Sequence, residues 1–123
     1  MNAIQEANRY LENAQEILST KAKKEDGYYQ DKKYIKMAGH TAYSGVLVAL
    51  DALLPKKKGR KSIEYYQEFL SKTDKKMLNQ LESVYEIFHL VMGYDGFGKE
   101  VYIKEGFKDA EKIINWVEMR LAA

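Results

Sequence analysis

The fold is decided by residues 31–55, which read DKKYIKMAGHTAYSGVLVALDALLP. Asp31 belongs to the residue types that cap helix N-termini, and Pro55 cannot continue a helix, so the stretch predicts one helix between them. Its predicted core face comprises Ile35, Ala38, Ala42, Val46, Ala49, Leu50 and Leu53, with Tyr43, Leu47 and Leu54 at the edges. Together these residues span about half of the circumference at ~100° per residue, which predicts a central helix in contact with more than one neighbour.

Two glycines, Gly39 and Gly45, lie inside this predicted helix. Each glycine costs a helix about 1 kcal/mol relative to alanine. We expect close approach of another helix to compensate for this cost, and we rank a binding role for the bare backbone behind it.

Four further helices are predicted from apolar residues at helical spacing. Three of them cover about residues 2–23, 62–71 and 73–93, and the last begins at 104–107 and ends at about 121. Asn2 with Gln5 resembles a capping box at the first N-terminus, and Gly93 is expected to end the fourth helix. The short helix lies between the second and third long ones, and the connections suit antiparallel neighbours. The sequence therefore predicts an all-α fold, an up-down four-helix bundle with one additional short helix.

Composition limits the classes of protein to which the chain can belong. Its 123 residues fit one domain, residues 1–123. No stretch reaches the ~20 apolar residues of a membrane-spanning helix, and the polar N-terminus contains no hydrophobic signal region. The net charge of +2 provides no general field for nucleic acid, and the chain has no cysteine. We therefore expect a cytoplasmic protein that does not associate with membranes.

Two segments carry a family resemblance: ANRYLENAQEIL at residues 7–18 and YIKMAGHTAYSGVL at residues 34–47. With the short helix and the closing helix, they make the chain resemble the HEPN (higher eukaryote and prokaryote nucleotide-binding) domains. Catalytic members of that superfamily cleave RNA with an Arg-x(4–6)-His motif. The matching positions before His89 are Glu82, Ser83 and Val84, and those before His40 are Lys33, Tyr34 and Ile35. Because none is Arg, the resemblance implies a divergent, non-catalytic homodimer that binds a nucleotide, nucleic acid or a protein partner.

His89 is the first candidate for site chemistry. Tyr85 lies four residues before it and shares its helix face, and Asp95 follows on a loop. If His89 acts as an acid or base with these neighbours, the protein is a divergent ribonuclease. The favoured interpretation is a structural histidine at the edge of the core. Glu86 and His89 form half of a di-iron motif whose second half is missing, so no metal site and no cofactor are predicted.

Two surface segments are candidates for ligand binding. The glycine-rich loop after His89 contains Tyr94 and Phe97, which either fold back on the bundle or, with His40, offer a surface for a small ligand or a base. A basic loop could bind the phosphates of nucleic acid, although such charge runs are more often merely solvated. Its residues are Lys56, Lys57, Lys58, Arg60 and Lys61.

Overall fold

The computed structural model of the chain describes residues 1–56, 59 and 61–123. Its elements in chain order are α1 (Ala3–Lys21), β1 (Lys24–Glu25), β2 (Tyr28–Tyr29), α2 (Lys32–Asp51), α3 (Ile63–Thr73), α4 (Lys75–Val84), the π-helix η1 (Tyr85–Tyr94) and α5 (Glu100–Ala122). Because η1 continues α4, these elements make four long helices with α3 as the additional short one. The predicted all-α bundle is confirmed.

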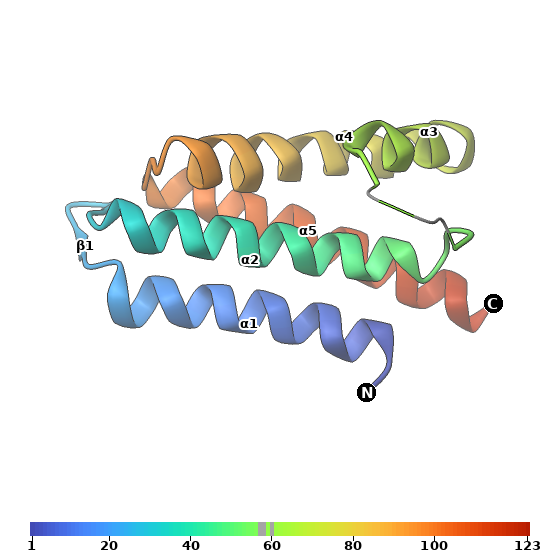
Figure 1. The fold of residues 1–123 in the computed structure, drawn as a ribbon, viewed down its shortest axis with the longest axis horizontal. Helices are drawn as coiled ribbons and strands as arrows, with labels where there is room; N and C mark the ends of the chain where they lie inside the picture. Colours follow the sequence, from blue (N-terminus) through green and yellow to red (C-terminus); the bar gives the residue numbers. More distant parts are fainter. Residues whose placement is uncertain (57–58, 60) are drawn as a thin grey trace.

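Helix α2 lies at the centre of the arrangement, as its wide apolar face predicts. It contacts α1 on one side, η1 on the other and α5 behind, and Figure 1 shows α1, α2 and the α4–η1 pair side by side with α5 at the back. Both chain ends lie at one end of the bundle, and the β1–β2 hairpin lies at the opposite end. None of the described helices combines the length and the apolar character needed to cross a membrane.

The helix ends follow from local chemistry. Asn2 and Gln5 form the predicted capping box, in which the Gln5 N–H donates to Asn2 Oδ1 at 2.8 Å and the Asn2 N–H donates to Gln5 Oε1 at 3.1 Å. Asp31 caps α2 by accepting from the Lys33 N–H at 3.1 Å. These caps satisfy backbone donors that have no partner within the helix.

Glycine permits the predicted close helix contacts. A Cβ atom on Gly45 would lie 2.7 Å from Tyr10 Cβ of α1, and one on Gly39 would lie 2.5 Å from the Phe88 carbonyl oxygen of η1. Real Cβ atoms essentially never show such distances, so both glycines allow a backbone approach that alanine would block. Helix α2 is therefore packed tightly against both neighbours.

Several helix boundaries differ from the prediction, and helix α2 ends at Asp51 before the predicted stop at Pro55. The fourth helix does not stop at Gly93 but ends at Tyr94, and the positive φ angle of +65° falls on Gly96. Helix α5 begins at Glu100, earlier than the predicted start at 104–107. Val101 and Tyr102 of its first turn are exposed, so this turn lacks the buried apolar pattern on which the prediction depended.

The connection between α1 and α2 contains a β-hairpin that the sequence analysis did not predict. Its two-residue turn is Asp26-Gly27, with φ angles of +51° and +80°. Positive φ at both central positions defines the type I′ turn that an Asp-Gly pair favours. The hairpin also pairs with the chain before α5, through an antiparallel bridge between Tyr28 and Lys99.

Candidate functional site

His89 is positioned by the π-helix η1. In a π-helix each backbone N–H bonds to a carbonyl five residues back, and such segments are frequent at functional sites. The wider turn places both Tyr85 and Tyr94 beside His89, with ring centroids 5.0 and 5.6 Å from its imidazole. His89 is thus enclosed by aromatic rings from its own helix.

Helix α2 adds two rings from the other side. The ring centroid of Tyr43 lies 5.1 Å from that of His89, and the centroid of His40 lies 6.0 Å away. We name these residues the imidazole cluster: His40, Tyr43, Tyr85, His89 and Tyr94. The structure therefore brings together four of the predicted site residues and adds Tyr43, which the sequence analysis had assigned to the edge of the core.

The cluster favours the neutral form of His89. Burial lowers the pKa of His89, and the nearby His40 lowers it further because two positive charges would repel. The Nδ1 atom of His89 is buried without a hydrogen-bond partner among the described residues. Burial also raises the pKa of the Tyr43 hydroxyl to about 12, with smaller contributions from Tyr85 and Glu64. His89 is therefore neutral near pH 7, and the Tyr43 hydroxyl keeps its proton there.

The polar partners of His89 bear on the chemistry that this arrangement can perform. No described carboxylate hydrogen bonds to His89, so nothing in the described chain orients its imidazole as a third partner would. The described residues contain no group of three His, Cys, Asp or Glu side chains that could hold a metal ion.

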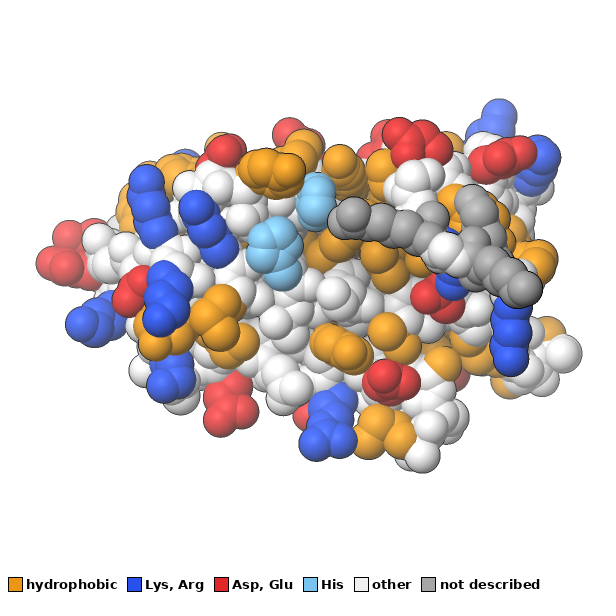
Figure 2. Space-filling model, in the orientation of Figure 1, with side chains coloured by type: hydrophobic (Ala, Val, Ile, Leu, Met, Phe, Trp, Pro, Cys, Tyr) orange, Lys and Arg blue, Asp and Glu red, His pale blue; other side chains and the backbone are white. Residues whose placement is uncertain are grey.

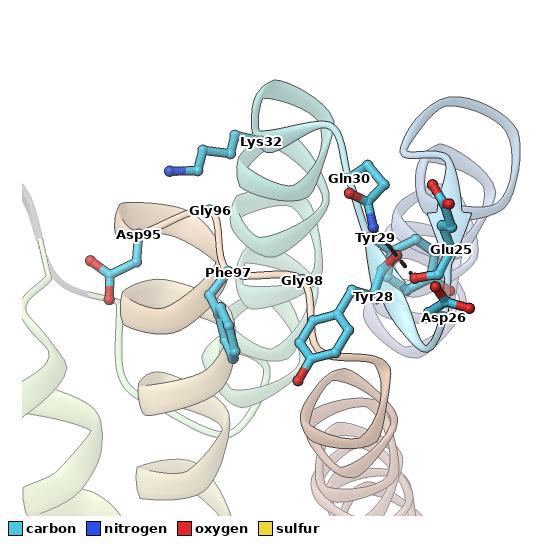
Figure 3. A pocket seen from close by; sticks show the side chains of 10 residues that line it. All are labelled: Glu25, Asp26, Tyr28, Tyr29, Gln30, Lys32, Asp95, Gly96, Phe97 and Gly98. Atoms are coloured by element: carbon cyan, nitrogen blue, oxygen red, sulfur yellow. Dashed lines mark hydrogen bonds between the residues drawn. The ribbon is translucent and has the colours of Figure 1, made fainter.

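Two further predicted site residues, Asp95 and Phe97, are not part of the imidazole cluster. They line an open hollow of about 690 Å³ between the β1–β2 hairpin and the 95–98 loop, shown in Figure 3. The lining residues are Glu25, Asp26, Tyr28, Tyr29, Gln30, Lys32, Asp95, Gly96, Phe97 and Gly98. Asp95 thus lines this hollow together with residues of the hairpin, and His89 is not among the lining residues.

The hairpin half of this hollow was missed from the sequence, although Asp26-Gly27 is a strong hairpin signal. Each strand has only two residues, which is too short to show the alternation of apolar and polar residues that marks a β-strand in a sequence. The residues that line the hollow are thus far apart in the chain, and only the pairing of the hairpin with the chain before α5 brings them together.

The basic loop contributes little free charge to the described surface. Lys61 forms an ion pair with Asp51 at 2.9 Å, and the Tyr66 hydroxyl donates to the same carboxylate oxygen at 2.8 Å. Lys56 is exposed, whereas the candidates Lys57, Lys58 and Arg60 lie outside the described residues. The ion pair fastens the end of this loop to the end of α2.

Comparison with known proteins identifies relatives over almost the whole chain. A solved structure described as a protein of unknown function from Dyadobacter fermentans is 60% identical, with a TM-score of 0.93 over 96% of this chain and 95% of that chain. No curated protein matches the sequence. The family model described as Domain of unknown function (DUF5618) matches residues 2–119. The chain therefore belongs to the DUF5618 family.

Proposed function

We propose that this chain is a non-catalytic, HEPN-like interaction module that forms a homodimer through the outer face of α2. We define that face by its partly or fully exposed residues Met37, His40, Thr41, Ser44 and Val48. The observation that carries the proposal is the absence of charge: from Met37 to Leu50, this helix contains no Asp, Glu, Lys or Arg.

A solvent-facing helix surface ordinarily carries charged side chains. The cores of protein interfaces, by contrast, are depleted of charge and enriched in methionine and aromatic residues. The outer face of α2 fits the second description, with Met37 45% exposed and Tyr94 of the neighbouring η1 69% exposed. Figure 2 shows white and orange atoms above and below the two histidines, with blue Lys and Arg side chains toward the hairpin end.

The imidazole cluster supports the same proposal. His89 has a lowered pKa and is neutral near pH 7, so a partner can cover it without burying a charge. His40 is exposed beside it and offers a polar ring at the middle of a face that contains no Asp, Glu, Lys or Arg. A second copy related by two-fold symmetry would present the same surface, so the face must complement itself.

The test is the solution mass of the protein. We expect light scattering after gel filtration to give twice the chain mass of 14.3 kDa at micromolar concentration. Ser44→Arg places a charge at the centre of the face, and an unpaired buried charge costs about 2 kcal/mol or more, which weakens the dimer by roughly thirtyfold.

Asn8→Arg is the matched control, because Asn8 is an exposed polar residue of α1 outside the proposed face. It should leave the dimer intact. A wild-type monomer at micromolar concentration would contradict the proposal, and so would a Ser44→Arg protein that dimerises as tightly as the control.

A further inference from the structure

The two histidines of the chain lie side by side at the outer face of α2. His40 belongs to that face, one turn before Ser44, and the centroid of its ring lies 6.0 Å from that of His89 in η1. Histidine is the side chain whose ordinary charge change falls between about pH 5 and 8, and the chain contains no other histidine. A change of pH across this range therefore acts mainly on one small surface.

Packing keeps the two imidazoles next to each other. A Cβ atom on Gly93 of η1 would lie 2.8 Å from His40 Cε1, so a side chain at this position would take the place of the His40 ring. His89 is enclosed in turn by the three tyrosines of the imidazole cluster. Burial, and then the nearby His40, lower the pKa of His89, because two protonated rings so placed would repel each other.

No carboxylate of the same chain is paired with either ring. None of the described Asp and Glu side chains forms an ion pair with a histidine. Glu64 of α3 interacts electrostatically with Tyr43, and Glu86 of η1 is exposed. Helix α5 meets η1 through the uncharged rings of Phe107 and Phe88. A positive charge on the imidazoles therefore depends on water for its stabilisation.

A second copy supplies no counter-charge either. By two-fold symmetry it presents the same face, which contains no Asp or Glu from Met37 to Leu50. The charged residue that precedes this stretch on α2 is Lys36, one turn before His40, and its ammonium adds to the repulsion. A protonated imidazole in the interface would thus be a buried charge without a partner, which is strongly unfavourable.

We propose that the dimer contact is a pH switch, in which protonation of His40 and His89 separates the two copies. The switch rests on the proposed dimer and adds its regulation. Because neutral imidazoles can be covered and charged ones cannot, association is complete above the histidine range and is lost as the pH falls through it. One proton taken up by each chain on dissociation raises the dissociation constant of the dimer by up to about a hundredfold per pH unit.

Sedimentation velocity over a dilution series measures this dissociation constant at constant ionic strength. We expect the wild-type protein to dimerise at about pH 7.5, and its dissociation constant to rise by at least about tenfold at about pH 5.5. Circular dichroism at both pH values should show that the separated chains remain folded. A monomer at about pH 7.5 refutes the proposed dimer and the switch with it, whereas an equally tight dimer at about pH 5.5 refutes the switch alone.

The decisive variant is His40→Gln combined with His89→Gln, because it leaves no histidine in the chain. It should dimerise with about the same dissociation constant at both pH values, since glutamine is polar and does not titrate. Met37→Leu is the matched control, because it changes the same face without a titratable group, and it should keep the pH dependence of the wild type.

Three results with these proteins would overturn the switch. The first is a histidine-free variant that dissociates at low pH as the wild type does. The second is a histidine-free variant that is monomeric at both pH values, because a neutral side chain should replace a neutral imidazole. The third is wild-type dissociation that coincides with unfolding.

Discussion

Replacing Gly39 with alanine tests the contact between α2 and η1. The new Cβ would lie 2.5 Å from the Phe88 carbonyl oxygen and 2.7 Å from Met92 Cβ. Neither atom is the end of a flexible side chain, so the whole π-helix must move away. Gly106→Ala of α5 is the matched control, because its Cβ would meet only side-chain atoms, Ile87 Cγ2 at 2.7 Å and the Phe88 ring at 2.8 Å, and no backbone atom at such a distance.

The magnitude follows from two opposing effects. Alanine gains about 1 kcal/mol over glycine in helix propensity, while overpacking a core costs about 1–3 kcal/mol. Because the Gly39 contacts are rigid, we place its overpacking cost at the upper end and expect a net loss of about 1–2 kcal/mol in the free energy of unfolding. This loss corresponds to a decrease in Tm of roughly 3–10 °C for a chain of this length.

Urea unfolding followed by circular dichroism measures both variants. Gly39→Ala should lower the midpoint without changing the slope, and Gly106→Ala should lower it less. If Gly39→Ala instead stabilises the protein by the full propensity gain of about 1 kcal/mol, then η1 does not approach α2 as closely as described.

Three further predictions concern polar groups. The pKa of His89 in the folded state lies below its unfolded value of about 6.5, so the folded protein binds fewer protons. The free energy of unfolding should therefore fall as the pH is lowered below about 6.5. His89→Gln should weaken this pH dependence of the urea midpoint. Ser83→Ala removes the 2.6 Å hydrogen bond to Asp109, which is 4% exposed, so calorimetry should show a loss of about 1–3 kcal/mol; an unchanged Tm would mean that water replaces the hydroxyl. Tyr66→Phe removes the 2.8 Å bond to Asp51 and should cost about 0.5–1.5 kcal/mol in urea unfolding, and no loss would show that the bond is offset by solvent.

The fold could be predicted because helical periodicity and capping are local properties of the chain. Asp31 marks the start of α2, and Gly39 and Gly45 already indicated its close neighbours. The start of α5 was misplaced because Val101 and Tyr102 are apolar but exposed, so the buried pattern begins only at Ile103. Apolar residues at helical spacing indicate the buried face of a helix, so an exposed first turn shows no such spacing in the sequence.

The candidate sites could be predicted only in part, because they depend on contacts between elements. At α-helical spacing His89 and Tyr85 share a helix face, but the approach of Tyr43 from α2 depends on helix packing. The grouping of Asp95 with His89 was based on proximity in sequence, whereas Asp95 lines the hollow at the 95–98 loop. A π-helix also changes which residues share a face, and propensity alone does not predict it.

The π-helix has a consequence for insertions and deletions. Each of its hydrogen bonds encloses one more residue than an α-helical bond, so η1 holds surplus chain relative to an α-helix. Loss of one residue between Tyr85 and Tyr94 can convert part of η1 to α-helix and leave the helix before and after it in place. The same loss from α2 would rotate half of its apolar face by ~100° away from its neighbours. Length variants should therefore be tolerated in η1 and rejected in α2.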